Sequence, residues 1–97
     1  MITGKQKRYL RGLASGIKAS LQIGKGGLTE SLIEDIGRHL KKRELVKISV
    51  LQTSPLGKKE AAEKTARLTG SELVQVIGRK IVLYKRSEDK PGITLPD

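Results

Sequence analysis

The chain has 97 residues, of which 36% are hydrophobic and none is cysteine. This length suits one domain with a modest core, and the absence of cysteine excludes disulfides, thiolate metal sites and cysteine nucleophiles. Its 20 Lys and Arg residues outnumber its 10 Asp and Glu residues, which gives a formal net charge of +10. Because this charge exceeds what solubility requires and destabilises the fold by self-repulsion, it favours a polyanionic partner.

The positive charge is concentrated near the N-terminus, where no acidic residue precedes Glu30. An unbroken set of cations favours a nucleic-acid surface over an ordinary solvated helix face. The set consists of Lys5, Lys7, Arg8, Arg11, Lys18 and Lys25.

Apolar runs in the chain are short. The N-terminal residues lack the hydrophobic stretch of a signal peptide, and the longest apolar run, residues 81–84, has only four residues. Neither secretion nor membrane spanning is expected, and we predict a cytoplasmic protein.

The first predicted element is a helix over residues 4–15. Thr3 and Gln6 form the pattern of a capping box at its start, and Gly16 follows its end. At 100° per residue, Lys7, Arg8 and Arg11 lie on the solvent face. The face predicted to pack consists of Gln6, Tyr9, Leu10 and Leu13.

A strand over residues 19–23, a glycine loop and a second helix from about residue 28 follow. Thr29 is the predicted N-cap of this helix, and cations cluster in its last turn, where they complement the helix dipole. Its predicted buried stripe consists of Leu32, Ile33, Ile36 and Leu40. Alternating apolar residues at positions 46, 48 and 50 then predict a strand over residues 45–51.

The remaining elements are a helix over residues 58–69, closed by Gly70, and strands over residues 73–77 and 80–85. The third helix has a thin apolar face of Ala61, Ala62, Thr65, Ala66 and Leu68. Gly78 and Arg79 fit a two-residue hairpin turn with glycine first. Residues 86–97 contain two prolines and a glycine and are predicted to be an extended tail.

These elements predict an α/β (α+β) fold, with an N-terminal helix followed by β-α-β-α-β-β. The two strand–helix–strand units predict parallel pairing, and the final hairpin predicts an antiparallel pair. We therefore expect one domain, residues 1–97, with a mixed four-stranded sheet packed against three helices.

The most informative motif is the glycine loop Gly24-Lys25-Gly26-Gly27, which lies between the first strand and the second helix. Glycines allow close approach of a ligand to the backbone, and the following helix start presents unpaired N–H groups. A Gly-x-x-Gly pattern alone is weak evidence, but this context and Lys25 favour a phosphate contact of the KH type, in which such a loop clamps the nucleic-acid backbone.

Other binding and catalytic classes fit the sequence poorly. The loop lacks the spacing of a Walker motif and the third glycine of a dinucleotide fingerprint. The single histidine, His39, lies among cations at the edge of a helix, so zinc and triad chemistry lack partners and no metal or other cofactor is expected. Tyr9 and Tyr84 are the only aromatic residues, which argues against RRM and OB-type readers that stack bases on several rings. We predict that the protein is not an enzyme.

Four segments together resemble one known family. They are Lys5-Gln6-Lys7-Arg8-Tyr9-Leu10-Arg11-Gly12-Leu13-Ala14, Gln22-Ile23-Gly24-Lys25-Gly26-Gly27-Leu28-Thr29, Glu44-Leu45-Val46-Lys47, and Val74-Gln75-Val76-Ile77-Gly78 followed by Ile81-Val82-Leu83-Tyr84. The family is the CRM domain (chloroplast RNA splicing and ribosome maturation), in particular its stand-alone bacterial form, the YhbY-like RNA-binding proteins. The resemblance covers nearly the whole chain.

The resemblance implies a fold similar to the C-terminal domain of translation initiation factor three and RNA binding through the glycine loop and the adjacent basic surface. It also implies association with ribosomal RNA or precursors of the large ribosomal subunit, and no enzymatic activity. The loop residues match the family directly, whereas the helix cations and Lys47 match in type, and Lys47 could equally be a strand residue facing solvent. The predicted RNA-binding residues are Gly24, Lys25, Gly26, Gly27, Thr29, Lys5, Lys7, Arg8, Arg11, Lys18 and Lys47.

In the favoured mechanism, the N–H groups of Gly26 and Gly27 and the start of the second helix receive a phosphate, and Lys25 neutralises it. The protein acts as a monomer in ribosome assembly. Two other readings are open. One is a module that docks on a ribosomal or acidic protein and uses its charge for steering. The other is a non-specific nucleic-acid binder, disfavoured for DNA because no recognition helix is apparent.

Overall fold

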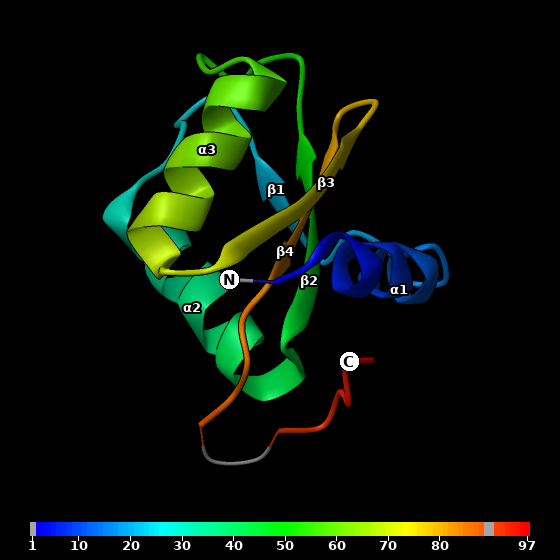
Figure 1. Ribbon diagram of the computed structural model, residues 1–97. Helices are drawn as coiled ribbons and strands as arrows, with labels where there is room; N and C mark the ends of the chain where they lie inside the picture. Colours follow the sequence, from blue (N-terminus) through cyan, green and yellow to red (C-terminus); the bar gives the residue numbers. More distant parts are fainter. Residues whose placement is uncertain (1, 89–90) are drawn as a thin grey trace.

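Seven helices and strands follow one another in the computed structural model, which describes residues 2–88 and 91–97. They are α1 (Gly4–Ala14), β1 (Leu21–Ile23), α2 (Glu30–Arg43), β2 (Leu45–Val50), α3 (Lys58–Thr69), β3 (Glu72–Ile77) and β4 (Lys80–Tyr84). This order confirms the predicted fold class (Figure 1).

The strands form one mixed sheet in the order β1-β2-β4-β3. β1 and β2 are parallel, as the connection through α2 predicts, and β3 and β4 form the predicted antiparallel hairpin. The expected parallel pairing across α3 is wrong, because β4 lies between β2 and β3 and is antiparallel to both. The hairpin turn has glycine first, with Gly78 at a φ of 56°.

Helices cover both faces of the sheet. α2 and α3 lie on one face and α1 lies on the other (Figure 1). The larger core consists of Ile23, Ile36, Leu40, Val46, Ile48, Val50, Ala61, Ala62, Ile81 and Leu83. The smaller core, beneath α1, consists of Leu10, Ala14, Leu45, Val74, Val82 and Tyr84.

The start of α1 confirms the capping box: the Gln6 N–H donates to Thr3 Oγ1 and the Thr3 N–H donates to Gln6 Oε1. The predicted packing face is only partly correct. Leu10 is buried, but Tyr9 and Leu13 remain 43% and 39% exposed. An 11-residue helix that lies alone on its sheet face buries only a narrow stripe, and in α1 that stripe consists of Leu10 and Ala14.

α2 and α3 pack much as their patterns indicate. Thr29 is the N-cap of α2, and Ile36 and Leu40 are fully buried. α3 has the predicted bounds, and its C-cap Gly70 adopts the left-handed conformation with φ 66°. Leu68 was predicted to be part of the buried face of α3, but it is 54% exposed. It lies at the flank toward α2, where it lines a shallow surface cavity with Leu28 and Ile33.

Candidate nucleic-acid interface

The residues 24–27 form a tight turn at the end of β1, called here the glycine turn. The Gly27 N–H donates to the Gly24 carbonyl oxygen at 3.0 Å, which closes the turn. Lys25 and Gly26 occupy the two central positions and are exposed. The turn therefore presents one cationic side chain and one residue without a side chain at its tip.

Gly27 has a structural role in this turn. It is buried, its φ is 69°, and a Cβ added to it would lie 3.2 Å from Pro55 Cγ. The expectation that its N–H receives a phosphate is corrected, because that N–H is used within the turn. Gly26 differs: a Cβ there would meet only Thr29 Cγ2 at 3.8 Å, an ordinary contact.

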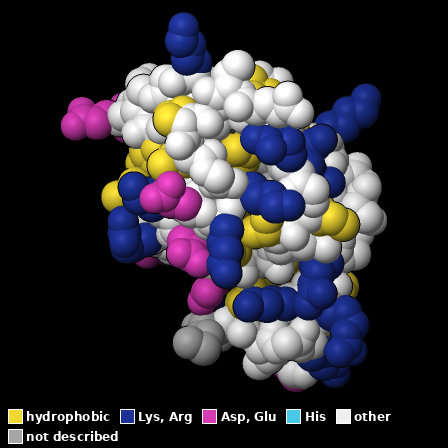
Figure 2. Space-filling model, turned by 90° about the horizontal axis from the view of Figure 1, so that it is seen from above, with side chains coloured by type: hydrophobic (Ala, Val, Ile, Leu, Met, Phe, Trp, Pro, Cys, Tyr) yellow, Lys and Arg dark blue, Asp and Glu magenta, His cyan; other side chains and the backbone are white. Residues whose placement is uncertain are grey.

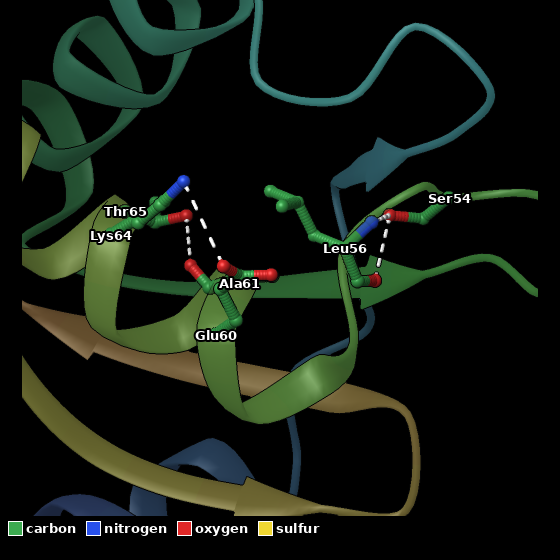
Figure 3. Close-up of polar contacts among 6 residues, drawn as sticks. All are labelled: Ser54, Leu56, Glu60, Ala61, Lys64 and Thr65. Carbon is green, nitrogen blue, oxygen red and sulfur yellow. Dashed lines mark hydrogen bonds and ion pairs between the residues drawn. The ribbon is translucent and has the colours of Figure 1, made fainter.

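The segment that packs on Gly27 is itself held by hydrogen bonds. Ser54 Oγ donates to the Leu56 carbonyl at 3.0 Å and accepts from the Leu56 N–H at 3.1 Å (Figure 3). α3 begins just after this loop, and the Thr65 hydroxyl donates to the Ala61 carbonyl within that helix. Pro55, between two residues fixed in this way, is a firm support for the glycine turn.

The start of α2 follows the glycine turn directly. Thr29 Oγ1 accepts the Leu32 N–H at 3.1 Å, and the Thr29 carbonyl accepts the Ile33 N–H at 3.0 Å. Thr29 therefore caps the helix, as predicted, and its hydroxyl is already engaged. Among the described residues, the N–H groups of Gly26, Glu30 and Ser31 have no protein acceptor, so they can receive an anion at the positive end of the helix dipole.

The predicted cations fall into separate groups in space. Lys5, Arg8 and Arg11 are exposed on α1, and Lys7 is half-buried there. α1 lies on the sheet face opposite α2, so these cations and the body of α2 are on different sides of the sheet. Within the described part of the chain, the ion pairs are Arg38–Asp35 and Lys64–Glu60, so none of the predicted cations is neutralised by a carboxylate.

Lys18 and Lys47 belong to neither α1 nor the glycine turn. Lys18 is exposed in the connection from α1 to β1, and the next exposed residue, Ser20, donates its N–H to the Lys47 carbonyl. Lys47 alternates with the core residues Val46 and Ile48, so its side chain is on the α1 side of the sheet. Figure 2 shows Lys and Arg side chains over most of the surface in view, most densely on the right, whereas Asp and Glu side chains lie mainly on the left, beside some of the cations.

Sequence reasoning missed Arg79 as a cation near the glycine turn. Its Nε donates to the Val50 carbonyl at 2.8 Å, and its guanidinium also donates to the Leu51 carbonyl at 3.0 Å. The Arg79 carbonyl in turn accepts the Val50 N–H at 2.7 Å. Arg79 thus ties the hairpin tip to the end of β2, beside the glycine turn, and no local sequence signal indicates this long-range contact.

Glu44 was also missed as a structural residue. It follows α2 with a φ of 66°, is only 2% exposed, and accepts the N–H groups of Ser87, Gly92 and Ile93 at 2.7, 2.6 and 2.8 Å. Burial acts to raise the pKa of its carboxyl, but these donors and the charge of Arg86 outweigh burial and lower the pKa. The described residues after β4 contain no helix or strand, and Glu44 fastens them to the domain through these three bonds.

Metal and catalytic sites need several ligating or titratable side chains close together. No group of three or more His, Asp or Glu residues in the part of the chain that the structure describes could hold a metal ion. His39 lies with its Nδ1 3.5 Å from Ser20 Oγ, with no carboxylate partner among the described residues. In the same part of the chain, no helix is long and apolar enough to cross a membrane.

Known proteins are similar to this chain in sequence. The family model of the CRS1 / YhbY (CRM) domain matches residues 2–85. The probable RNA-binding protein YqeI of Bacillus subtilis (strain 168) is 46% identical over 99% of this chain and 100% of its own length. An RNA-binding protein of Haemophilus influenzae is 34% identical, over 91% of this chain and 89% of its own.

A solved structure has the same architecture. The solution structure of the hypothetical protein SAV1595 from Staphylococcus aureus matches with a TM-score of 0.83 and 53% identity, over 99% of this chain and 100% of its own. The Bacillus subtilis and Haemophilus influenzae relatives are named as RNA-binding proteins and not as enzymes. The chain belongs to the CRS1/YhbY (CRM) domain family, which confirms the resemblance seen in its residues.

Proposed function

We propose that this chain is a single RNA-binding domain, residues 1–97, that grips the RNA backbone at the glycine turn. The phosphate lies at the start of α2, where it accepts the N–H groups of Gly26, Glu30 and Ser31, and Lys25 neutralises it. The observation that carries this proposal is the exposed Lys25-Gly26 tip next to helix N–H groups that have no acceptor among the described residues. The names of the relatives support RNA as the ligand.

The wider proposal is that the domain acts as a monomer in the cytoplasm, on ribosomal RNA or precursors of the large ribosomal subunit, without catalysing a reaction. Lys5, Lys7, Arg8, Arg11, Lys18 and Lys47 then contact phosphates that follow the one held at the glycine turn. A formal net charge of +10 supports such an extended electrostatic contact.

The double variant Lys25→Asp with Gly26→Asp tests this proposal. We expect its affinity for a single-stranded RNA to fall at least about tenfold near 0.1 M salt, because it removes one cation and adds two anions at the phosphate site. Both positions are exposed and Gly26 has room for a side chain, so the melting temperature should stay close to that of the wild type. Fluorescence anisotropy and circular dichroism measure the two quantities.

A salt titration of the same proteins separates a phosphate contact from a general loss of charge. The log–log slope of the association constant should be about −0.7 per phosphate for the wild type and shallower by about that amount in the double variant. The matched control Lys58→Asp with Lys59→Gln lowers the net charge by the same amount and changes exposed cations at the start of α3. Equal losses in the two variants, or an unchanged affinity in the first, would contradict the proposed phosphate site.

A second candidate function, docking on a protein of the ribosomal particle, is favoured by one feature. Leu28, Ile33 and the exposed Leu68 line a surface cavity together with Glu30 and Glu34, and such an apolar patch with acidic edges suits a basic protein. Purification of the particle-bound protein with and without ribonuclease distinguishes the two functions. Release by ribonuclease supports direct RNA contact, whereas retention supports the protein contact.

A further inference from the structure

α1 covers only part of its face of the sheet, and one row of side chains beside it crosses all four strands. Gln22 of β1 pairs with Ser49 of β2, Ser49 pairs with Lys80 of β4, and Lys80 pairs with Ile77 of β3. Directly paired residues have side chains on the same face. The row therefore reads Gln22, Ser49, Lys80 and Ile77 from one sheet edge to the other.

The alternation of each strand places this row on the α1 side. Ile23, Val50 and Ile81 belong to the core beneath α2 and α3, so their neighbours Gln22, Ser49 and Lys80 point to the opposite face. Val82, on that same face, is fully buried beneath α1. The row lies beyond this cover: Ser49 is half-buried, Gln22 and Lys80 are exposed, and Ile77 is 58% exposed.

The row continues into the glycine turn. Leu51, next after Ser49 on this face, is 37% exposed, and its Cδ1 would lie 3.5 Å from a Cβ at Gly24. Arg79 adds a fixed positive charge here through its bonds to the Val50 and Leu51 carbonyls. We call Gln22, Lys47, Ser49, Leu51, Ile77 and Lys80 the open sheet face.

The chemistry of the open sheet face suits nucleotides. It contains cations and no Asp or Glu, so it complements phosphates, and its exposed aliphatic side chains offer contact area to the faces of unstacked bases. A Gln amide and a Ser hydroxyl can bond base edges. The face is four strands wide, about 14 Å at a strand spacing of about 4.8 Å, so more than one base fits on it.

Building on the proposed phosphate site, we propose that the open sheet face binds the bases of a single-stranded RNA segment whose backbone is held at the glycine turn. The chain leaves Lys25, passes Leu51 and Arg79, and lays its bases across the row from Gln22 to Ile77. A duplex keeps its bases stacked and paired, so it cannot make these contacts. The domain thereby prefers unpaired RNA.

The double variant Gln22→Ala with Ile77→Ala tests the open sheet face without changing any charge. With a labelled single-stranded RNA of mixed sequence, about 12 nucleotides long, we expect a dissociation constant about five- to tenfold higher than for the wild type. The log–log salt slope should be unchanged, because no phosphate contact is lost. Leu68→Ala is the matched control: Leu68 has a similar exposure, 54%, but lies on α3, and its affinity should equal that of the wild type.

Nuclear magnetic resonance on the wild-type protein gives a second readout. Addition of the single-stranded RNA should shift the Ile77 methyl and Gln22 side-chain amide signals, whereas the buried Ile48 methyl should stay in place. A duplex of the same length should move only signals of the glycine turn and the cations.

Wild-type affinity in the double variant, or single-stranded shifts confined to the glycine turn, would overturn this inference. If only this inference fails, the Lys25→Asp with Gly26→Asp variant still loses affinity; if the proposed function also fails, that variant binds normally.

Discussion

Replacing Glu44 by glutamine should lower the free energy of unfolding by about 2–3 kcal/mol. The carboxylate accepts three backbone N–H groups, from Ser87 on Oε2 and from Gly92 and Ile93 on Oε1. An amide has one acceptor oxygen and turns an NH2 group toward at least one of these donors, so a buried N–H loses its partner and the charge assistance disappears. For a chain of this length the melting temperature should fall by about 10 °C or more.

The effect of this substitution extends to α1. Ile93 and Leu95 pack on the core beneath α1, and the Gln6 side-chain amide donates to the Pro96 carbonyl at 3.0 Å. Without the Glu44 bonds, we expect the amide hydrogen exchange of α1 to speed up relative to the wild type by more than that of α3. Glu63→Gln, an exposed carboxylate on α3, is the matched control and should leave the melting temperature unchanged. An equal effect of both substitutions would show that only net charge matters.

The contribution of Glu44 also depends on pH. Its folded-state pKa is lowered from the ordinary value of 4.5, so the ionised form is the one that folding favours. The stabilisation is therefore fully present above the unfolded-state pKa and is lost as the pH falls through the folded-state pKa. The stability gap between the wild type and Glu44→Gln should be constant near neutral pH and narrow below about 4.5, as denaturant titrations can measure. A gap independent of pH would contradict the ionised carboxylate.

Local sequence patterns predicted those features that local interactions determine. The capping box of Thr3 and Gln6, the bounds of α3 and the alternation of β2 each depend on neighbouring residues, and the structure confirms them. The order of strands does not depend on neighbours, so the insertion of β4 between β2 and β3 was missed. Tyr9 and Leu13 were misplaced because the stripe that α1 buries is set by the sheet beneath it.

The candidate site was predictable in its residues but not in their roles. The glycine pattern located the turn. The sequence could not distinguish Gly26, where a Cβ would make only an ordinary contact, from Gly27, which has a positive φ and a close neighbour in Pro55. Pro55 is distant in sequence, so no local signal joins it to Gly27. Glu44 gave one indirect signal, since helices commonly end with glycine in a positive-φ position and this helix ends with glutamate. A glutamate in this backbone conformation, where glycine is favoured, indicates that the fold uses its side chain.

Gly27→Ala should lower the free energy of unfolding by about 2–3 kcal/mol, the second large effect expected in this protein. A φ of 69° costs a residue with a Cβ about 1–2 kcal/mol, and the 3.2 Å approach to Pro55 Cγ adds a packing penalty of about 1 kcal/mol. Gly26→Ala is the matched comparison, because it has no positive φ and its Cβ would make only an ordinary contact. Its stability should equal or slightly exceed that of the wild type, since alanine restricts the unfolded chain.

The two alanine variants should differ again in RNA binding. Gly26→Ala places a methyl group at the tip where a phosphate approaches, so we expect severalfold weaker binding with no loss of stability. Gly27→Ala should weaken binding together with stability, because the turn must shift away from Pro55 before it can accommodate the Cβ. Denaturant titration and anisotropy on the same two proteins check both statements. Equal stability of the two variants would contradict the structural role of Gly27. Wild-type affinity of Gly26→Ala would contradict the close approach of a phosphate to Gly26.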